Sequence, residues 1–374
     1  MIIGIDGRAA YWYRGTGIGT YVYQLIYKQS QLDQYNHYYI LIPKESDYSF
    51  IWGDNFHKTP VDNMRKDRFW EELEIKDVLL DRNVDLYHIP QNGIGMPKEK
   101  ICPFVITLHD VIPITMPETV GPYYCKKFLD SIPEILDKSD AILTVSEFSK
   151  ADICRELSLP EDKVFVSRLA AEDIYTPVDK SLARAYIREK YSIEDDFFLY
   201  VGGFNPRKNI KSLLLAFAYI KEKLKKSYKI VILGKQGKSY DDLVNLSHKL
   251  KINNDCIFTG FIPVDDMPFF YNAASVFVYP SLYEGFGLPV VESMACGTPV
   301  ITSNITSLPE VVGDAAITLS PEDYEAIGDN MLQLVEDDKL YETMRIKALE
   351  RAALYSWDKT VKDTIEVYKR VALP

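Results

Sequence analysis

The feature that most constrains this chain is an alternation of short apolar, β-branched runs with longer stretches of helical periodicity. The short runs end abruptly in Gly, Pro, Asn or Asp, as buried strands of parallel sheets do. The alternation therefore predicts a parallel sheet in each half of the chain, covered by helices. In the first half, strands are expected at residues 2–6, 38–42, 85–89, 104–108, 141–145 and 164–166. In the second half, they are expected at residues 197–201, 229–233, 257–259, 276–279, 300–302 and 316–319.

Two domains fit the length of 374 residues, since each would be large enough to bury its own core. Residues 168–177 show no periodicity and lie midway, which makes them the candidate linker. We predict an α/β fold of two Rossmann-like, doubly wound domains, at residues 1–172 and 173–356. The helical segment from residue 357 to the end at 374 is expected to pack back on the first domain. Ligands of open parallel sheets bind beyond the carboxyl ends of the strands, so functional residues should directly follow strands.

Composition narrows the classes of partner. The net charge of -11 argues against a nucleic-acid partner, because phosphate backbones require a basic surface. Five scattered cysteines without CxxC spacing predict neither a disulfide framework nor a zinc site. The N-terminus lacks a signal-peptide pattern, and no apolar run approaches the roughly 20 residues of a membrane span, so a cytoplasmic protein is expected. Lys126, Lys127 and residues 65–68 fit an ordinary solvated surface better than a patch for anionic lipid.

The segment with the strongest functional signal is VFVYPSLYEGFGLPVVESMACG at residues 276–297. It predicts a strand, a glycine-containing loop and a helix that begins near Pro289 and stops at Gly297. Such a loop before a helix offers backbone N–H groups and a positive dipole end to an anion such as a diphosphate. Glu284 lies in the loop and Glu292 lies one turn inside the helix. Taken alone, the two carboxylates could equally be a helix cap and a solvated helix residue.

The spacing EGFGLPVVE at residues 284–292 closely resembles the Glu-x7-Glu signature of retaining glycosyltransferases of family 4, which have the GT-B fold. Residues 298–300 and 308–314 are also similar to this family. The resemblance implies that Glu284 contacts hydroxyls of the donor sugar as a catalytic residue and that Glu292 binds the ribose of the nucleotide. It further implies that the sugar and diphosphate are held by the backbone of Gly285, Phe286, Gly287 and Leu288.

A second loop, YVGGFNPRKN at residues 200–209, follows a strand and precedes a helix. Arg207 and Lys208 suit a diphosphate, with a bidentate fork and a point charge respectively, although adjacent cations in a loop are usually only solvated surface. They resemble the family's phosphate-binding Arg and Lys. Many members carry Arg directly after Val-Gly, where this chain has Gly203. We therefore assign the Arg role to Arg207 and keep Gly203 as a backbone contact to the donor.

Three further positions follow from the same resemblance. Gly17, in the loop RGTGIGT at residues 14–20, matches the family's glycine that touches the donor diphosphate; the loop is not a GxGxxG dinucleotide motif. His109 directly follows a strand and is implied to be a second catalytic residue beside the donor sugar, although a lone His more often satisfies a buried group. Phe261 follows a strand where family members hold the nucleotide base, and packing is an equally good explanation for it.

The resemblance implies a retaining transferase that uses a nucleotide sugar as co-substrate, with no other cofactor. No Asp-x-Asp pair stands in a suitable setting, so we expect no metal requirement. Residues 108–113 and 202–209 look most like bacterial mannosyltransferases that build surface polysaccharide, which favours GDP-mannose over a UDP-sugar. Acceptor contacts are expected from the first domain, where Gln91, Asn92 and residues 11–13 are candidates.

The expected acceptor is a glycan or a lipid-linked saccharide, and the second of these leaves open a peripheral contact with the inner face of the membrane. Three alternatives stand beside the transferase: a sugar-nucleotide epimerase on the same architecture, a non-catalytic nucleotide-sugar binding protein, and an NAD-dependent enzyme. An epimerase would act without an acceptor. The last two would be separated from the transferase by whether UDP, GDP or NAD stabilises the protein against heat.

Overall fold

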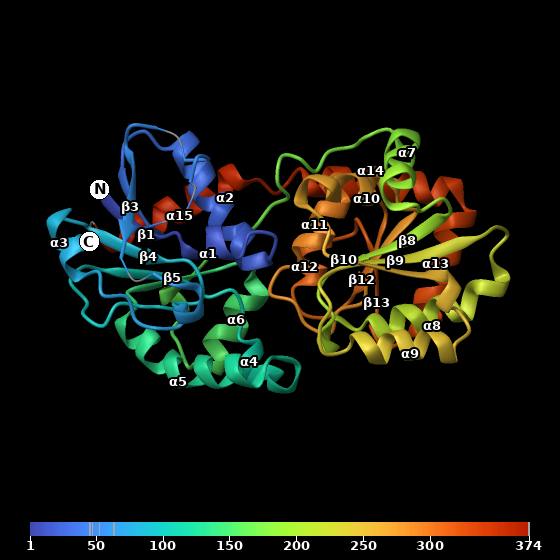
Figure 1. Cartoon of the computed structure of the whole chain (residues 1–374), viewed down its shortest axis with the longest axis horizontal. Helices are drawn as coiled ribbons and strands as arrows, with labels where there is room; N and C mark the ends of the chain where they lie inside the picture. The colour runs from blue at the N-terminus through green and yellow to red at the C-terminus, as the bar shows by residue number, and fades with distance from the viewer. Residues whose placement is uncertain (45, 47, 52, 63, 373–374) are drawn as a thin grey trace. The chain divides into compact units, whose positions relative to one another are not determined.

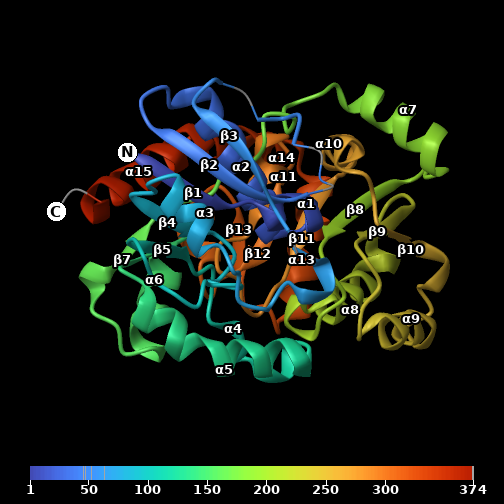
Figure 2. The same ribbon diagram turned by 60° about the vertical axis from the view of Figure 1, so that its left-hand side comes forward.

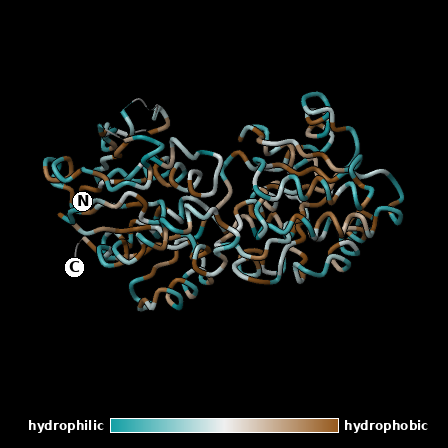
Figure 3. Tube along the Cα trace, turned by 60° about the horizontal axis from the view of Figure 1, so that its bottom comes forward, coloured by the Kyte–Doolittle hydropathy of each residue, from teal (hydrophilic) through white to brown (hydrophobic). Residues whose placement is uncertain are grey.

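The computed structural model describes residues 1–44, 46, 48–51, 53–62 and 64–372, and the chain forms two compact units (Figure 1). Unit 1 comprises Met1–Leu169 together with Ser356–Pro374, and unit 2 comprises Ala170–Tyr355. The C-terminal segment thus belongs to the same unit as the N-terminus. Short hydrophobic segments alternate with hydrophilic ones along the trace of each unit (Figure 3), as expected where short buried strands alternate with amphipathic helices.

Within the described residues, unit 1 contains a seven-stranded parallel sheet in the order β3-β2-β1-β4-β5-β6-β7. The strand order reverses between β1 and β4, and the carboxyl ends of these strands mark the place where such sheets bind ligands. The strands are β1 (Ile2–Asp6), β2 (His37–Pro43), β3 (Phe56–Val61), β4 (Leu86–Ile89), β5 (Phe104–Thr107), β6 (Ala141–Thr144) and β7 (Val164–Val166).

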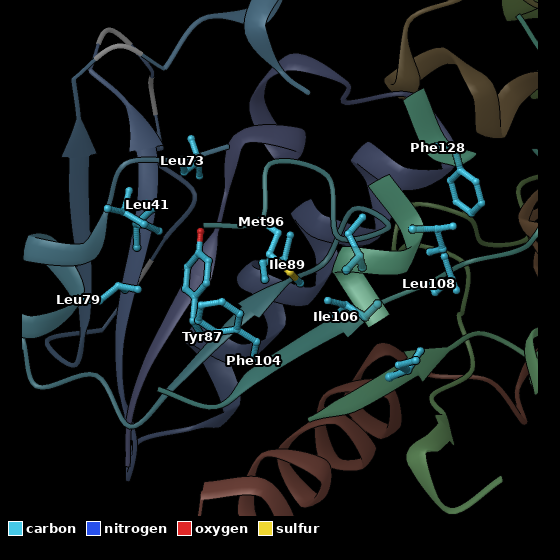
Figure 4. Close-up of a cluster of buried hydrophobic side chains, with 14 of the residues drawn as sticks. Leu41, Leu73, Leu79, Tyr87, Ile89, Met96, Phe104, Ile106, Leu108 and Phe128 are labelled. Atoms are coloured by element: carbon cyan, nitrogen blue, oxygen red, sulfur yellow. The ribbon is translucent and has the colours of Figure 1, made fainter. Parts of the chain in front are cut away.

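Helices cover both faces of this sheet. The α-helices of unit 1 are α1 (Arg8–Trp12), α2 (Gly17–Leu32), α3 (Lys76–Asp81), α4 (Ile112–Thr115), α5 (Pro122–Lys138), α6 (Glu147–Glu156) and α15 (Trp357–Ala372). On one face, side chains of α3 and α5 join those of the strands in a fully buried cluster (Figure 4), which includes Leu41, Leu79, Tyr87, Phe104, Ile106, Leu108 and Phe128.

The C-terminal helix α15 lies beside α2 on the other face (Figure 2). Its Tyr368 hydroxyl is 2.6 Å from Nδ1 of the buried His88, and the Ser167 hydroxyl donates to the Thr360 carbonyl at 3.0 Å. The Nε2 of His88 lies 2.8 Å from the Thr107 hydroxyl, and burial lowers the pKa of His88 to about 3. The end of the chain is therefore joined by buried polar contacts to β4 and to the residue after β7, and His88 in turn joins β4 to β5.

Unit 2 repeats the architecture with six parallel strands among its described residues, in the order β10-β9-β8-β11-β12-β13. They are β8 (Asp196–Val201), β9 (Tyr228–Leu233), β10 (Cys256–Gly260), β11 (Val276–Tyr279), β12 (Val300–Ser303) and β13 (Ile317–Leu319). The helices are α7 (Lys180–Tyr191), α8 (Ile210–Ile220), α9 (Tyr240–Lys249), α10 (Met267–Ala273), α11 (Leu288–Ala295), α12 (Leu308–Val312), α13 (Tyr324–Glu336) and α14 (Asp338–Ala352). Helices α8, α9 and α13 cover one face, and α10, α11 and α14 cover the other (Figure 1).

The predicted fold class, two doubly wound parallel α/β sheets, is confirmed. Every expected strand is present, with each end within one residue of its expected place. One strand was not predicted: β3 reads FHKTPV, pairs with β2 at the edge of the sheet formed by the described strands, and buries Phe56, Thr59 and Val61. Its polar side chains and Pro60 remove the continuous apolar run by which buried strands are recognised, whereas both are tolerated at an edge.

Candidate functional site

The loops that follow the adjacent strands β8 and β11 bring three predicted site residues of unit 2 together. The Lys208 ammonium donates to Oε1 of Glu284 at 2.6 Å, and Nη1 of Arg207 donates to the same oxygen at 3.1 Å. The two loops are also joined through the backbone, because the Leu282 N–H donates to the Arg207 carbonyl at 2.7 Å. The expected phosphate-binding cations and the first glutamate of the Glu-x7-Glu pattern thus form one cluster.

Glu284 is buried, and its carboxylate is held through a single oxygen. Besides the two cations, Oε1 accepts from the Tyr279 hydroxyl at 3.1 Å and from the Ser281 hydroxyl at 2.5 Å. Burial raises the pKa of Glu284, but the charges of Lys208 and Arg207 outweigh it and hold the pKa below its usual value. Within the described part of the chain, no group donates to Oε2. Glu284 is therefore ionised, and Oε2 is the oxygen that can take a substrate hydroxyl.

The backbone of the loop at residues 284–288 is supported from behind by the loop after β12. The buried Ser307 hydroxyl donates to the Glu284 carbonyl at 2.8 Å and to the Phe286 carbonyl at 3.2 Å. Gly287 has a φ of 103° and precedes α11; a Cβ there would lie 2.7 Å from a methyl of Leu308. No side chain caps this helix start. Within the first turn of α11, Pro289 has no N–H, and the N–H groups of Val290 and Val291 donate to the Gly287 carbonyl at 2.9 and 3.4 Å. The Leu288 N–H is therefore the group of this turn that the loop can present to an anion.

Glu292 lies inside α11, as predicted, and is half-buried. Its Oε2 accepts from the Tyr271 hydroxyl of α10 at 2.7 Å. Burial, and secondarily the nearby Glu292 charge, raises the pKa of Tyr271 well above its usual value, so the phenol stays a donor. The two glutamates of the pattern therefore have different partners and can contact different parts of a ligand.

Two further predicted donor residues follow β8 and β10. Around Gly203, no atom lies within 4 Å of where a Cβ would stand, so nothing in the protein itself requires a glycine there. The side chain of Phe261 is 65% exposed, whereas that of its neighbour Ile262 is buried. The side chain of Phe261 is therefore not packed in the core of unit 2, and its contact with a nucleotide base stays a prediction.

In unit 1, His109 follows β5 and is buried. Its Nε2 lies 3.0 Å from the Pro90 carbonyl, its backbone N–H donates to Oδ1 of Asn92 at 2.9 Å, and its ring meets the Tyr21 ring edge-on at 4.8 Å. Because a carbonyl can only accept, Nε2 carries the ring proton. Burial lowers the pKa of His109 to about 4, so the ring is neutral and presents Nδ1 as an acceptor.

In the glycine loop at residues 14–20, Gly17 and Gly19 differ in how tightly they are packed. A Cβ at Gly19 would lie 1.8 Å from the Tyr13 carbonyl oxygen, so packing requires Gly19. At Gly17, the first residue of α2, nothing lies within 4 Å of a Cβ. A side chain at Gly17 would thus meet open space where one at Gly19 would clash, and the approach of Gly17 to a ligand stays a prediction.

Two of the residues suggested for acceptor contacts serve the protein's interior. Gln91 is fully buried and donates to Asp6 at 2.5 Å, and Asn92 is buried against the backbone of His109. Asp6 in turn forms a fully buried ion pair with Arg8, which also donates to carbonyls of two neighbouring loops. The sequence did not indicate this network, which orders the loops at the carboxyl ends of β1 and β4.

Sequence reasoning also missed the hydroxyls that hold the two glutamates: Tyr271, Tyr279, Ser281 and Ser307. Their positions in the segment could have been noted, but nothing in these residue types distinguishes them from ordinary strand and helix residues. Among the described residues, no three His, Cys, Asp or Glu side chains are grouped so that they could hold a metal ion. None of the helices described is both long enough and apolar enough to cross a bilayer.

Comparisons with known families cover most of both units. The family described as Glycosyltransferase Family 4 matches residues 15–168, and that described as Glycosyl transferases group 1 matches residues 184–351. The chain is 38% identical to the O-antigen chain mannosyltransferase B of Escherichia coli, over 76% of this chain and 74% of that protein. It is 30% identical to the O-antigen chain mannosyltransferase RfbU of Salmonella typhimurium, over 58% of this chain and 57% of the relative.

Among solved structures, the chain resembles the sucrose-phosphate synthase of Thermosynechococcus elongatus, with a TM-score of 0.78 at 20% identity. The match covers 99% of this chain and 98% of that structure. At this identity the likeness shows the fold, and it confirms that the two sheets are those of a GT-B protein.

Proposed function

Because this chain belongs to glycosyltransferase family 4, we propose that it transfers mannose from GDP-mannose to a glycan or lipid-linked saccharide, with retention of anomeric configuration. The observation that carries the proposal is the cluster of Lys208, Arg207 and Glu284 at the carboxyl ends of β8 and β11. The choice of mannose is supported by the two relatives, both of which are named mannosyltransferases. We place the reaction in cell-surface polysaccharide biosynthesis, in the cytoplasm and at the inner membrane face for a lipid-linked acceptor.

Unit 2 would hold the nucleotide end of the donor. Lys208 and Arg207 neutralise the diphosphate, and the Leu288 N–H at the start of α11 adds a further donor. Glu292 accepts from a ribose hydroxyl, and the base lies against the turn at Phe261, whose ring is exposed. Neutralising the diphosphate makes it a better leaving group, which is the main electrostatic task of such an enzyme.

For the sugar, we assign Glu284 and His109 the role of hydrogen-bond acceptors. Oε2 of Glu284 takes one hydroxyl, and Nδ1 of His109 takes another, because Nε2 already donates to a carbonyl. Gly17 offers backbone at a point without obstruction. These contacts orient the anomeric carbon rather than exchange protons with it.

In the chemical step, an acceptor oxygen forms a bond to the anomeric carbon on the face that the diphosphate leaves. The bond between that carbon and the diphosphate oxygen breaks, and its electron pair stays with the diphosphate. The acceptor's proton passes to a diphosphate oxygen. The step is balanced without a protein base and without a metal ion.

The test is incubation with GDP-mannose, UDP-glucose and UDP-N-acetylglucosamine in the presence of EDTA, with mass spectrometry of the products. We expect slow release of GDP and mannose from GDP-mannose alone, and faster loss of donor when a saccharide acceptor is added. Release of UDP instead would show that the donor is a UDP-sugar and not GDP-mannose. Conversion of a nucleotide sugar into its epimer would show that the protein is an epimerase and not a transferase. Activity that requires Mn²⁺ would contradict the metal-independent step. The variant Lys208→Ala, assayed under the same conditions, should no longer release GDP and mannose from GDP-mannose.

A further inference from the structure

In the cluster of Lys208, Arg207 and Glu284, here called the donor cluster, the hydroxyl of Tyr279 contacts both Lys208 and Glu284. It accepts from the Lys208 ammonium at 2.5 Å and lies 3.1 Å from Oε1 of Glu284. The tyrosine is fully buried at the last position of β11. Burial, together with the Glu284 charge, raises its pKa well above the usual value, so the phenol keeps its proton and donates it to the carboxylate.

The ring that carries this hydroxyl cannot move far. It stacks on Tyr200 with ring centroids 5.8 Å apart and on Phe277 at 5.7 Å. The backbone carbonyl of Tyr279 also accepts from Thr302 on the neighbouring strand at 2.9 Å. A tyrosine has two side-chain torsions, whereas a lysine has four, so the phenol of Tyr279 is more rigid than the Lys208 side chain that also donates to Oε1.

The cations can hold Glu284 while no nucleotide sugar is bound, whereas the uncharged hydroxyls can hold it when one is bound as well. Lys208 and Arg207 are the groups assigned to the diphosphate, so a bound donor competes with Glu284 for them. The hydroxyls of Tyr279 and Ser281 carry no charge to share with a phosphate. They are the contacts that remain directed at Oε1 while the donor is bound.

We propose that Tyr279 is a positioning residue for sugar transfer: its hydroxyl holds Oε1 of Glu284 so that Oε2 faces the donor sugar after the cations have engaged the diphosphate. The proposal rests on the proposed function, because it gives Glu284 a role only in sugar transfer. It assigns Tyr279 no contact with substrate. A change at Tyr279 should therefore lower kcat, and it should do so only while Glu284 is present.

The variant Tyr279→Phe removes the hydroxyl and keeps the stacked ring. We expect kcat for release of mannose from GDP-mannose to fall about tenfold, at the lower end of what a hydrogen bond to a charged group contributes. The KM for GDP-mannose and the Kd for GDP should stay within twofold, because Lys208 keeps its charge. Tyr228→Phe is the matched control, since Tyr228 is buried at the opposite, amino-terminal end of the same sheet. It should leave kcat unchanged.

The decisive measurement is a double-mutant cycle. In the background of Glu284→Ala, which leaves no oxygen for Tyr279 to hold, Tyr279→Phe should have no further effect on the residual kcat. Additive losses, or an unchanged kcat in the single variant, would overturn the proposal. Loss of GDP affinity in step with kcat would also overturn it, since Tyr279 would then act on Lys208.

Should Tyr279→Phe fold poorly, Ser281→Ala removes the other neutral donor to Oε1 and must give the same split between kcat and Kd. A failure of the proposed function looks different in this experiment. In that case the unsubstituted protein releases no sugar from any nucleotide sugar, whereas a failure of the Tyr279 assignment leaves that release intact.

Discussion

Replacing Glu284 with Gln removes one negative charge and almost no volume from the donor cluster. In the unsubstituted protein this carboxylate neutralises two cations whose side chains are only 13% and 18% exposed, Lys208 and Arg207. The amide oxygen of Gln can still accept from Tyr279 and Ser281. The variant therefore isolates the charge of Glu284 from its shape.

The magnitude follows from this burial. Removing one partner of a buried ion pair costs about 3–5 kcal/mol of stability, and the isosteric amide places this variant near 3 kcal/mol. For a unit the size of Ala170–Tyr355, that corresponds to a fall in Tm of about 6–12 °C. A bound diphosphate supplies the missing negative charge. If it recovers about half of the lost energy, GDP binds the variant about tenfold more tightly than the unsubstituted protein.

The assay is thermal unfolding with and without GDP, and separately UDP, together with calorimetric Kd values and sugar release. We expect Glu284→Gln to show a low Tm without nucleotide, a larger stabilisation by nucleotide than the parent, and a loss of sugar release. Glu292→Gln makes the same chemical change where the carboxylate accepts from the phenol of Tyr271, and it should not tighten GDP binding. An equal fall in Tm with and without nucleotide, or weaker GDP binding by Glu284→Gln, would refute the view of Glu284 as counterion to the phosphate-binding cations.

Three other predictions follow from the same contacts. Lys208→Ala should weaken GDP binding by about 10- to 100-fold, the contribution of a charged hydrogen bond, as measured by calorimetry; unchanged affinity would remove Lys208 from the diphosphate. Gly17→Ala should fold with an unaltered Tm yet lose activity, whereas Gly19→Ala should lower the Tm, because a Cβ at Gly19 meets a backbone oxygen at 1.8 Å; full activity in Gly17→Ala would exclude a ligand there. Burial lowers the pKa of His88 to about 3 and that of His109 to about 4, whereas a histidine in the unfolded chain has a pKa of 6.5. The unfolded chain therefore binds more protons, and the free energy of unfolding falls as the pH is lowered below 6.5. Between pH 6.5 and 5.5 each histidine should cost about 1 kcal/mol in urea titrations, a loss that His88→Asn should halve.

The sheets could be predicted almost strand by strand because a buried parallel strand leaves a short, continuous apolar run. The exception, β3, lies at an edge: among the described strands it pairs with β2 alone, and an edge strand need not be apolar on both faces. In its sequence FHKTPV, Phe56, Thr59 and Val61 are buried, an irregular pattern that a loop could also show. Local residue preference cannot separate the two without knowing which strand it would pair with.

Within the candidate site, the residues with unusual spacing were the ones that sequence could locate. The Glu-x7-Glu pattern and the Arg-Lys pair each stand out, and the structure brings Glu284 to both cations. That Tyr279 and Ser281 converge on Oε1 could not be read from the chain, because their types are common in strands and turns. The convergence depends on the pairing of β11 with β8, which belongs to the tertiary structure and not to the local sequence.

The locations of the protons also bear on how the proposed reaction can run. A general base works best when its pKa lies near the working pH. Burial lowers the pKa of His109 to about 4, and the proton of its neutral ring is committed to the Pro90 carbonyl. The cations hold the pKa of Glu284 below its usual value. Both groups are weaker bases than a terminal phosphate, whose second pKa is about 6. In the proposed reaction the departing diphosphate is therefore the stronger acceptor for the attacking hydroxyl's proton, and the protein's part is to hold that oxygen and the anomeric carbon in place.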